Sequence, residues 1–396
     1  MKVYIVGTGM DGEKTLTNEA ETAIGKAGLL IGAERILKPF EKYGKEMFVS
    51  YKPADIAARI SCSEYRTAAV LMSGDCGFFS GARKLLPLLK EHDVSVIAGI
   101  SSAAYLCSKV KMPYEKMKFI TLHGRDSSIA VNVKMNEYCF FLLGGEMSAA
   151  DVCRRLCEYG LGGVKVYIGS ELASAEERII SGNAEELSEA EFPKLSVMIT
   201  ENKAYLRHIP SAVKDEEFTR AEIPMTKSEV RCIAVSKLNI CADSVVWDIG
   251  CGTGSVSVEA AYRCPDGAVY AFDKKDEAAA LTDVNSRRYG CDNVKAAVGE
   301  CPEILSDIPA PDKVFIGGSS ENMESILEAV HSKAPYADIA VTAVSLETLH
   351  EAVSCFEKYG IIPDVVQISV TRTKKLGSHT MLRAQNPVFI ISGSAS

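Results

Sequence analysis

The sequence predicts an α/β protein with a ligand-binding sheet in each half. Short apolar runs alternate with helical patterns along most of the chain, which is typical of α/β folds. Several of these runs stop at glycine-rich turns, and such turns favour a ligand crevice at the strand ends. The chain has 396 residues, a length that predicts two or three domains with buried cores.

The first lobe, residues 1 to about 112, has three predicted strands that each end at a glycine-rich turn. The strands are Val3–Val6, Ala68–Met72 and Val94–Ala98. The turns that follow them are residues 7–12, 73–80 and 99–102. We expect an open sheet with a crevice at its strand ends, and a helix from Ala103.

Residues 113–203 form a predicted second lobe of the same domain, of the α+β type. One well-defined helix, Ser148–Tyr159, lies among strands that are predicted at Lys118–Leu122, Tyr138–Leu143, Val164–Ile168 and Leu195–Thr200. Residues 204–224 contain two prolines and a charged run without an apolar period. We expect a linker or an ordered arm there.

The last region, residues 225–396, begins with a predicted helix. Residues 226–229, Thr-Lys-Ser-Glu, have the spacing of a capping box, and the apolar residues that follow share one helical face. Later strands are predicted before Asp248 and at Ala268–Phe272, Asn293–Val298, Lys313–Ile316, Ala337–Val341, Val365–Val370 and Pro387–Ile391. The pattern is α/β throughout and favours a seven-stranded sheet.

The stretch from Val245 to Gly254 carries the sharpest signal in the chain. Three β-favouring residues run into Asp248, glycines follow at 250, 252 and 254, and a helical pattern begins at Ser255. This is a strand, a tight turn and a helix N-terminus, so backbone N–H groups can approach a ligand closely. Gly-x-Gly-x-Gly alone is weak, because such a turn also occurs without a ligand.

Asp273 adds a second signal at the end of the next predicted strand, 25 residues after Asp248. A carboxylate there can accept hydrogen bonds from both hydroxyls of a nucleotide ribose. The alternative is that Asp273 caps the helix that follows. A dinucleotide site spaces its glycines differently, and Asp248 would repel a pyrophosphate but suits the ammonium group of S-adenosylmethionine. The charge argument favours the methyl donor.

The composition excludes several classes of function. The net charge is −8, which argues against a general nucleic-acid or anionic-membrane binder. No apolar run approaches the ~18 residues of a membrane helix, so we expect no membrane span. The 13 cysteines are scattered without zinc spacing. We expect them to be reduced, in a cytoplasmic protein without a metal site.

Two sets of motifs resemble known families. Those of the second half are Ile223–Arg231, Asp248–Gly254, Gly299–Glu303, Phe315–Ser319 and Asn386–Val388. Those of the first half are Val6–Gly12, Ser73–Asp75, Gly99–Ser102 and Leu122–Arg125. Residues 212–396 resemble the decarboxylating C15-methylating domain of cobalamin biosynthesis, and residues 1–203 resemble the tetrapyrrole methylase domain.

The two domains in this order resemble the decarboxylating C5,15-methyltransferases, over essentially the whole chain. The resemblance implies a two-lobed tetrapyrrole methylase domain at 1–203, a linker at 204–224 and a Rossmann-like, seven-stranded S-adenosylmethionine-dependent methyltransferase domain at 225–396. It implies methylation of a precorrin-6B-type macrocycle, or its cobalt form, at carbons 5 and 15, with decarboxylation of the ring-C acetate.

The resemblance also implies two S-adenosylmethionine sites per chain. In the second domain the donor site maps onto Thr226, Asp248, Gly250, Cys251, Gly252, Thr253, Gly254, Asp273 and Cys301. In the first domain it maps onto Asp75, Phe78, Ser101 and Ser102. For Ser101 and Ser102 the alternative is capping of the next helix. The family usually has Ala at position 301 and Pro at position 76, where this chain has Cys.

A substrate of this class carries many carboxylates, so an acidic protein needs local cations to hold it. Candidate substrate-binding residues are Arg125, Arg372, Lys374 and Arg383. Candidate catalytic residues are His123, Arg231 and His379, with His379 a guess for the proton donor in decarboxylation. The alternative for the C-terminal charges is a solvated loop.

Two other functions remain open at this point. One is an RNA methyltransferase with residues 1–203 as a binding module, although it predicts a basic stripe and aromatic platforms. The other keeps one active methylase and makes its partner domain a degenerate docking scaffold. The resemblance further implies a homo-oligomer.

Overall fold

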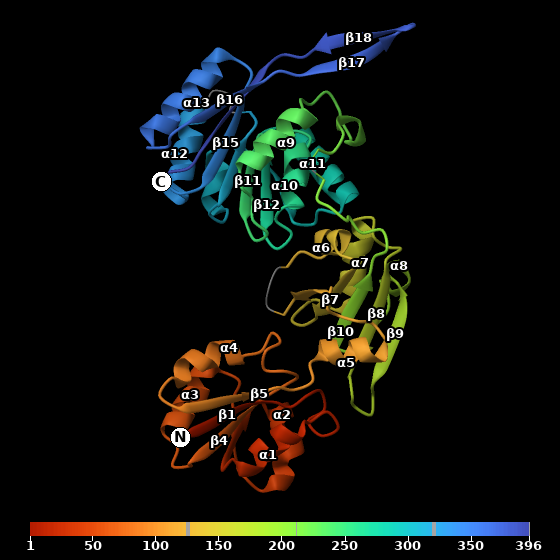
Figure 1. Ribbon diagram of the computed structural model, residues 1–396, viewed down its shortest axis with the longest axis vertical. Helices are drawn as coiled ribbons and strands as arrows, with labels where there is room; N and C mark the ends of the chain where they lie inside the picture. The colour runs from red at the N-terminus through yellow and green to blue at the C-terminus, as the bar shows by residue number, and fades with distance from the viewer. Residues whose placement is uncertain (124–126, 211, 319–321, 396) are drawn as a thin grey trace. The chain divides into compact units, whose positions relative to one another are not determined.

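A computed structural model describes residues 1–123, 127–210, 212–318 and 322–395. The chain forms two compact units (Figure 1). The first contains Met1–Arg125, Tyr138–Asp151 and Lys165–Glu201, and the second contains Asp126–Glu137, Val152–Val164 and Asn202–Ser396. Both units combine strands with helices, which confirms the predicted α/β class.

Two segments of the predicted first domain belong to the second unit, one containing α6 (Ala130–Met135) and the other Val152–Val164. The backbone N–H groups of Ile129 and Val131 donate to the Asp292 carboxylate, at 2.8 and 3.0 Å. The Asn132 amide donates to the Pro265 carbonyl at 2.9 Å. These contacts join segments far apart in the sequence, so local periodicity carries no sign of them.

The first sheet of the first unit is parallel and has the order β3-β2-β4-β1-β5. Its strands are β1 (Lys2–Gly7), β2 (Leu29–Gly32), β3 (Glu46–Val49), β4 (Thr67–Met72) and β5 (Asp93–Ile97). The helices of this region are α1 (Asn18–Lys26), α2 (Glu34–Leu37), α3 (Pro53–Ser61), α4 (Ala82–Leu85), α5 (Ser102–Lys109) and the 3₁₀ segments η1 (Lys38–Tyr43) and η2 (Leu86–Leu89).

Three glycines crowd together at the carboxyl edge of this sheet. A Cβ atom on Gly99 would lie 2.2 Å from the carbonyl oxygen of Gly74, and one on Gly7 would lie 2.7 Å from the same atom. Gly74 itself has a φ of +68°. Side chains at positions 7 and 99 would collide with backbone, so the glycine-rich turns let three strand ends meet.

The second sheet of the first unit is mixed and has the order β6-β7-β10-β8-β9. Only β6 and β7 are parallel among the described pairs. The strands are β6 (Lys118–Thr121), β7 (Tyr138–Leu142), β8 (Lys165–Ser170), β9 (Arg178–Asn183) and β10 (Ser196–Glu201). Two helices lie between these strands in the sequence. They are α7 (Ala149–Glu158), between β7 and β8, and α8 (Ala184–Leu187), between β9 and β10.

The second unit is organised around a seven-stranded sheet of order β13-β12-β11-β14-β15-β19-β16. β19 runs antiparallel to both of its neighbours, and the other pairs are parallel. The strands are β11 (Val245–Ile249), β12 (Ala268–Asp273), β13 (Val294–Val298), β14 (Lys313–Ile316), β15 (Asp338–Ala343), β16 (Asp364–Ile368) and β19 (Val388–Gly393). The helices are α9 (Ser228–Lys237), α10 (Ser255–Ala261), α11 (Asp276–Tyr289), α12 (Met323–Lys333), α13 (Leu346–Lys358) and the 3₁₀ segments η3 (Asp215–Glu217) and η4 (Glu303–Asp307).

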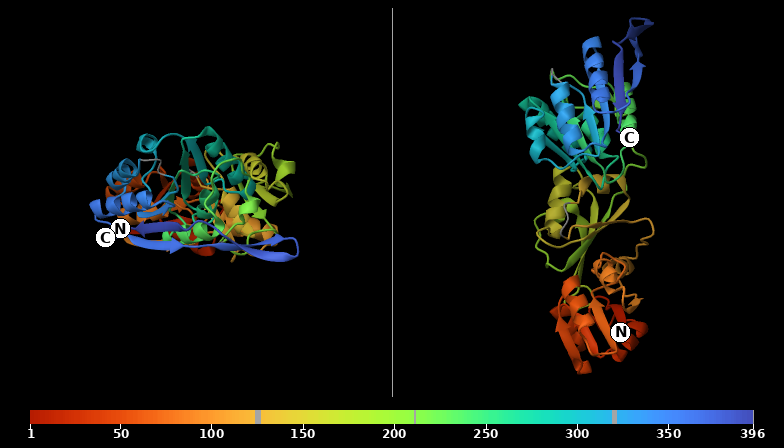
Figure 2. Two further views of the ribbon diagram at one scale, coloured as in Figure 1. Left: turned by 90° about the horizontal axis from the view of Figure 1, so that it is seen from above. Right: turned by 90° about the vertical axis from the view of Figure 1, so that its left-hand side faces the viewer.

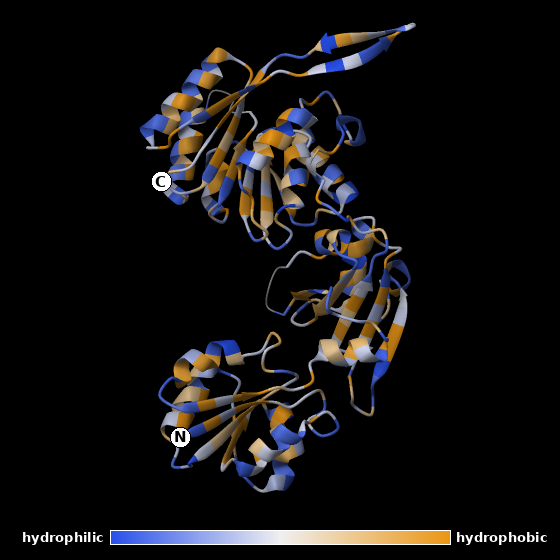
Figure 3. Ribbon diagram, in the orientation of Figure 1, coloured by the Kyte–Doolittle hydropathy of each residue, from blue (hydrophilic) through white to orange (hydrophobic). Residues whose placement is uncertain are grey.

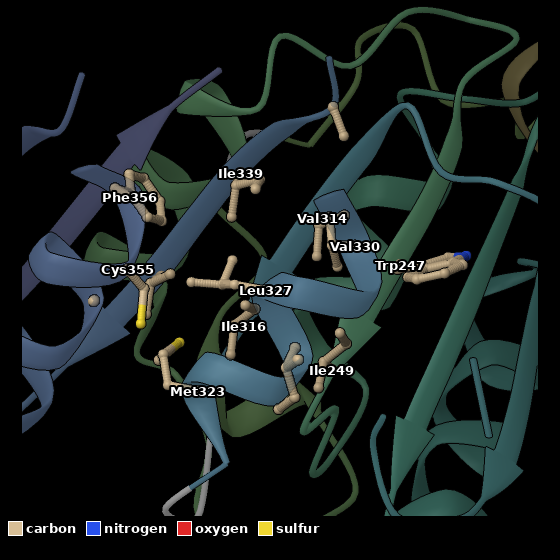
Figure 4. Packing of buried hydrophobic residues seen from close by; sticks show 14 of the residues in the cluster. Trp247, Ile249, Val314, Ile316, Met323, Leu327, Val330, Ile339, Cys355 and Phe356 are labelled. Carbon is tan, nitrogen blue, oxygen red and sulfur yellow. The ribbon is translucent and has the colours of Figure 1, made fainter. Parts of the chain in front are cut away.

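Apolar side chains cover both faces of this sheet. One face packs Trp247, Val314 and Ile339 against α12 and α13, as Figure 4 shows. The other face packs against α9 and α10, through residues such as Val246 and Phe315. Central parallel strands buried on both sides read as continuous apolar runs, and Figure 3 shows hydrophobic residues along them.

A hairpin of β17 (Thr371–Leu376) and β18 (His379–Ala384) extends away from the seven-stranded sheet (Figure 1 and Figure 2). The two strands pair only with each other within the described residues. Almost every residue in them is exposed. One alternative for this stretch was a solvated loop. The stretch is exposed to solvent, but it forms two regular strands and not a loop.

Residues 204–210 and 212–224 form an ordered arm on the second unit. Val213, Asp215 and Phe218 are buried there. The side chain of Asn285 on α11 accepts from the backbone N–H of Thr219 at 2.9 Å. None of the helices that the structure describes has the length and apolar composition to cross a bilayer.

Candidate active site

Three positions of the loop after β11 require glycine. Gly250, Gly252 and Gly254 have φ values of +75°, +56° and +72°. A Cβ on Gly250 would lie 2.9 Å from the backbone nitrogen of Gly318, and one on Gly252 would lie 2.9 Å from the Pro224 carbonyl oxygen. The loop therefore brings its backbone close to neighbouring segments before α10 begins at Ser255.

A cavity of about 1390 Å³ opens at the carboxyl edge of the central strands. It is lined by the glycine loop, by the ends of β12 and β14, by the segment leading into α9 and by the base of the β17–β18 hairpin. The predicted residues that it brings together are Thr226, Asp248, Gly250, Cys251, Gly252, Asp273, Cys301, Arg372, Lys374 and Arg383. Thr253, Gly254, Arg231 and His379 do not line it.

Asp248 lies at the base of the glycine loop and is fully buried. Its Oδ2 atom accepts a hydrogen bond from the Ser257 hydroxyl, and its Oδ1 atom has no partner among the described residues. Burial raises the pKa of this carboxyl to about 7, and the nearby Asp273 adds to the rise while Ser257 opposes it. A buried carboxyl oxygen without a partner beside a cavity is a feature that a cationic group on a ligand would satisfy.

Asp273 ends β12 and is partly exposed at the cavity. One carboxylate oxygen accepts from the Gly252 backbone N–H at 3.0 Å, and the other accepts from the Lys275 N–H at 3.0 Å. The helix that follows begins at Asp276 with Lys275 as its N-cap. Asp273 is therefore not the helix cap, and its contacts tie the glycine loop to the end of the second strand.

The predicted capping box at residues 226–229 is wrong. α9 begins at Ser228, its N-cap is Lys227, and no side chain of the cap residue bonds to the helix. Instead, the backbone N–H of Ser228 donates to Asp215 Oδ1 at 3.0 Å. Glu229 points to Arg372, whose Nε donates to it at 3.0 Å. An acid from the arm thus takes the capping position that the local motif suggested for Thr226.

Arg231, a predicted catalytic residue, is fully buried on α9. Its Nε donates to Glu259 at 2.7 Å, and its terminal nitrogens donate to Asp215 at 3.3 Å and to the Thr226 carbonyl at 2.7 Å. The Phe218 ring lies 5.0 Å from the guanidinium carbon. Because these partners surround the guanidinium away from the cavity, the geometry supports a positioning role and not contact with a substrate.

The three predicted C-terminal cations of the cavity differ in their surroundings. Arg372 donates to both Glu229 oxygens and to Asp215 Oδ2, the last at 3.2 Å. Hydrogen bonding to Glu229 raises the pKa of Arg372, so it stays cationic. Lys374 and Arg383 are exposed, and within the described residues no hydrogen bond or ion pair engages their side chains. His379 lies at the exposed turn of the hairpin.

The cavity also holds cations besides the candidate substrate-binding residues. They are Arg220, Lys227, Lys274 and Lys275. Among the described residues, the lining contains seven Lys and Arg side chains and three carboxylates, Asp248, Asp273 and Glu300. The whole chain has a net charge of −8, so this cavity is a local reversal of charge. Only the folded arrangement brings these distant basic residues together.

In the first unit, the predicted donor residues surround the crowded glycine turns. Asp75 accepts from the Gly77 and Gly99 backbone N–H groups, at 2.8 and 2.9 Å. Ser101 caps α5 by accepting from Ala104 at 3.1 Å, and Ser102 is the first helical residue. The alternative of capping thus holds for Ser101. Asp75 and Ser101 shape the turns, whether or not they also contact a ligand.

The other predicted residues of the first unit lie in different settings. The Phe78 ring packs against Phe119 and Phe140, with centroids 5.3 and 5.7 Å away. His123 is exposed, and its ring lies against Gly144, where a Cβ would come within 2.1 Å of Nδ1. Arg125 lies outside the described residues, as does Ser319 of the second-half motifs.

Comparison with known proteins covers both halves. Residues 2–188 match the family model of the Tetrapyrrole (Corrin/Porphyrin) Methylases, and residues 217–394 match the Precorrin methyltransferase domain. A probable cobalt-precorrin-6B C(15)-methyltransferase (decarboxylating) from Pyrobaculum calidifontis is 41% identical, over 46% of this chain and 95% of its own. The counterpart from Saccharolobus solfataricus is 39% identical, over 47% of this chain and 96% of its own.

The chain is also similar to a protein of known structure. The precorrin-6y C5,15-methyltransferase from Geobacter metallireducens GS-15 is 37% identical, with a TM-score of 0.46, over 48% of this chain and 100% of that chain. Two family models match successive parts of the chain, and the relatives are matched over nearly their whole length. These matches determine the family of the chain. The chain belongs to the precorrin methyltransferases of the decarboxylating C15 family, and it carries a tetrapyrrole methylase domain in front of that domain.

Proposed function

We propose that this chain is a bifunctional, S-adenosylmethionine-dependent C-methyltransferase of cobalamin biosynthesis. The substrate is a precorrin-6B-type macrocycle or its cobalt form, methylated at carbons 5 and 15 and decarboxylated at the ring-C acetate. One observation carries the proposal: a glycine loop and a cationic cavity adjoin in a chain of net charge −8. The cations of the cavity can attract a macrocycle that carries many carboxylates, even though the chain as a whole is acidic.

The residues of the second unit fit the methyl donor. S-adenosylmethionine supplies a sulfonium-bound methyl group that a carbon nucleophile can displace. Asp248 offers its unpartnered buried oxygen to the methionine ammonium, and Asp273 offers acceptors at the position of the ribose hydroxyls. The strand order of the sheet, with the glycine loop after its interior strand β11, supports a Rossmann-like methyltransferase fold.

The protein's part in the chemistry is to bind, orient and exclude water. Lys374 and Arg383 would hold substrate carboxylates, and Arg372 would support that side of the cavity through its own acids. The macrocycle carbon gives up a proton when its new carbon–carbon bond forms. In decarboxylation the bond to the carboxylate breaks, its electron pair enters the conjugated ring, and a proton then adds to the remaining carbon. Orientation and desolvation of that carboxylate are what the cavity must supply.

We propose that the first domain methylates carbon 5 at a separate donor site, which gives two donor sites per chain. The three glycines at its sheet edge, with Asp75 bonded to Gly77 and Gly99, are the supporting observation. We place the domains at 1–203 and 225–396, joined by the arm. All 13 cysteines are free thiols, which supports a cytoplasmic protein. We also propose a homo-oligomer, which light scattering of the purified chain would test.

Calorimetric titration with S-adenosylhomocysteine is the first test. We expect two sites per chain, and release of carbon dioxide together with transfer of two methyl groups to the macrocycle when the macrocycle and donor are added together. One binding event with one methyl group transferred would favour the scaffold alternative. Binding of RNA with methylation of it, and no reaction of the macrocycle, would overturn the proposal in favour of the RNA methyltransferase.

A further inference from the structure

We propose that Asp215 is a positioning residue that links the donor side and the substrate side of the cavity. Asp215 lies in the arm and does not line the cavity. Its carboxylate nevertheless contacts residues that fix both sides. The inference rests on the proposed function, because it concerns how that reaction's two ligands are held in register.

Asp215 is buried, with 3% of its surface exposed, and each of its oxygens has a separate task. Oδ1 accepts from the Ser228 backbone N–H at 3.0 Å and from the Arg231 guanidinium at 3.3 Å. Oδ2 accepts from the Arg372 guanidinium at 3.2 Å. One carboxylate therefore joins the start of α9, a buried arginine and the base of the hairpin.

The link to the donor side runs through Arg231. This arginine donates to the Thr226 carbonyl at 2.7 Å, and Thr226 lines the cavity beside the glycine loop. Glu259 holds the other edge of the guanidinium at 2.7 Å. With two carboxylates on it, Arg231 has little freedom to turn, so the position of Thr226 depends on Asp215 as well as on its own backbone.

The link to the substrate side runs through Arg372. Arg372 is directly opposite Arg383 in the hairpin register, and Lys374 follows two residues later on the same strand face. Since β17 and β18 pair only with each other within the described residues, contacts at their base set the hairpin's angle. Glu229 and Asp215 provide those contacts. Loss of Asp215 should therefore misplace the two unpaired cations.

The experiment uses the full-length chain with Asp215→Asn, which keeps the shape and removes the charge. We expect KM for cobalt-precorrin-6B to rise about tenfold or more, and S-adenosylhomocysteine to bind several-fold more weakly. Asp292→Asn is the matched control, because Asp292 is a half-buried acid of the same unit that lies outside the cavity and accepts backbone hydrogen bonds. This variant should lower the stability of the protein, but KM and the affinity for S-adenosylhomocysteine should stay unchanged.

Arg372→Lys is the second variant, for the case in which Asp215→Asn does not fold. Lysine keeps the charge but cannot hold Glu229 and Asp215 together, so KM should rise while affinity for S-adenosylhomocysteine stays the same. Both changes break the contact between Arg372 and Asp215, so the double variant should raise KM by less than the product of the two single effects.

Failure of the wild-type chain to bind S-adenosylhomocysteine or to convert the macrocycle would refute the proposed function itself. With an active wild type, two results overturn the role of Asp215. One is a folded Asp215→Asn whose KM and S-adenosylhomocysteine affinity match the wild type. The other, for Arg372→Lys, is an unchanged KM.

Discussion

The Asp273 carboxylate accepts a hydrogen bond from the backbone N–H of Gly252 at 3.0 Å. This contact joins the end of β12 to the middle of the glycine loop after β11. It leaves the carboxylate partly exposed to the cavity, where further hydrogen bonds can form. Asp273 therefore serves the shape of the loop and can also receive ribose hydroxyls.

Asp273→Asn should weaken S-adenosylhomocysteine binding in the second domain about 10- to 100-fold, because a charged acceptor is worth about 1.5 to 3 kcal/mol. In calorimetry the stoichiometry should fall from two sites to one at concentrations that saturate the first domain. Asp276→Asn is the matched control, since Asp276 is exposed and does not line the cavity. An unchanged isotherm for Asp273→Asn would remove Asp273 from the donor site.

Lys374 and Lys375 are neighbours on β17, yet only Lys374 lines the cavity. Lys374→Gln should raise KM for the tetrapyrrole about 3- to 10-fold, with a smaller effect at high salt. Its affinity for S-adenosylhomocysteine should stay the same. Lys375→Gln should match the wild type in both measurements, and equal effects of the two variants would argue against specific contact.

Arg231→Met should destabilise the second unit by about 3 to 5 kcal/mol, because it leaves the Glu259 carboxylate buried without its cation and removes one of the two cations that contact Asp215. Trp247, the single tryptophan of the chain, lies in the core of this unit and reports its unfolding in urea by fluorescence. Arg288→Met changes an exposed arginine and should stay within about 0.5 kcal/mol of the wild type. A similarly small loss for Arg231→Met would mean that the ion pairs contribute little.

Strands with continuous apolar runs could be predicted from the sequence. β1, β4, β11 and β12 lie where the apolar residues before each glycine turn placed them. β2 was missed because its four residues are too short for a periodic signal. β17 was missed because Thr-Arg-Thr-Lys-Lys-Leu has no apolar face, and only its pairing with β18 makes it a strand.

The residues of the proposed donor side adjoin glycines in the sequence, so a local motif was enough to single them out. Asp248 and Asp273 are set by the ends of two neighbouring strands, which a local motif records. Arg231 was misjudged for the opposite reason. A basic residue one turn into a helix looks solvent-facing, and only the arm residues Val213 and Phe218, packed from outside the helix, bury it. Asp215 carried no signal at all, since its partners lie up to 157 residues away.

Stability of the second unit should depend on the proton of Asp248. Burial raises the pKa of this carboxyl to about 7, whereas aspartates of an unfolded chain titrate near 3.9. The folded state thus holds the proton more tightly, so the stabilisation is complete below about pH 4 and is lost as the pH rises through about 7. Asp248→Asn keeps the shape and has no such proton to lose.

The Tm of the second unit can be followed by Trp247 fluorescence. Between pH 5 and pH 8 the Tm of the wild type should fall relative to that of Asp248→Asn. Asp243→Asn is the matched control, because Asp243 is exposed and its substitution should leave the wild-type pH dependence intact. If the difference in Tm between Asp248→Asn and the wild type were the same at both pH values, Asp248 would already be ionised at pH 5. Its unpartnered oxygen would then need a cationic or hydrogen-bonding neighbour that the folded chain by itself supplies.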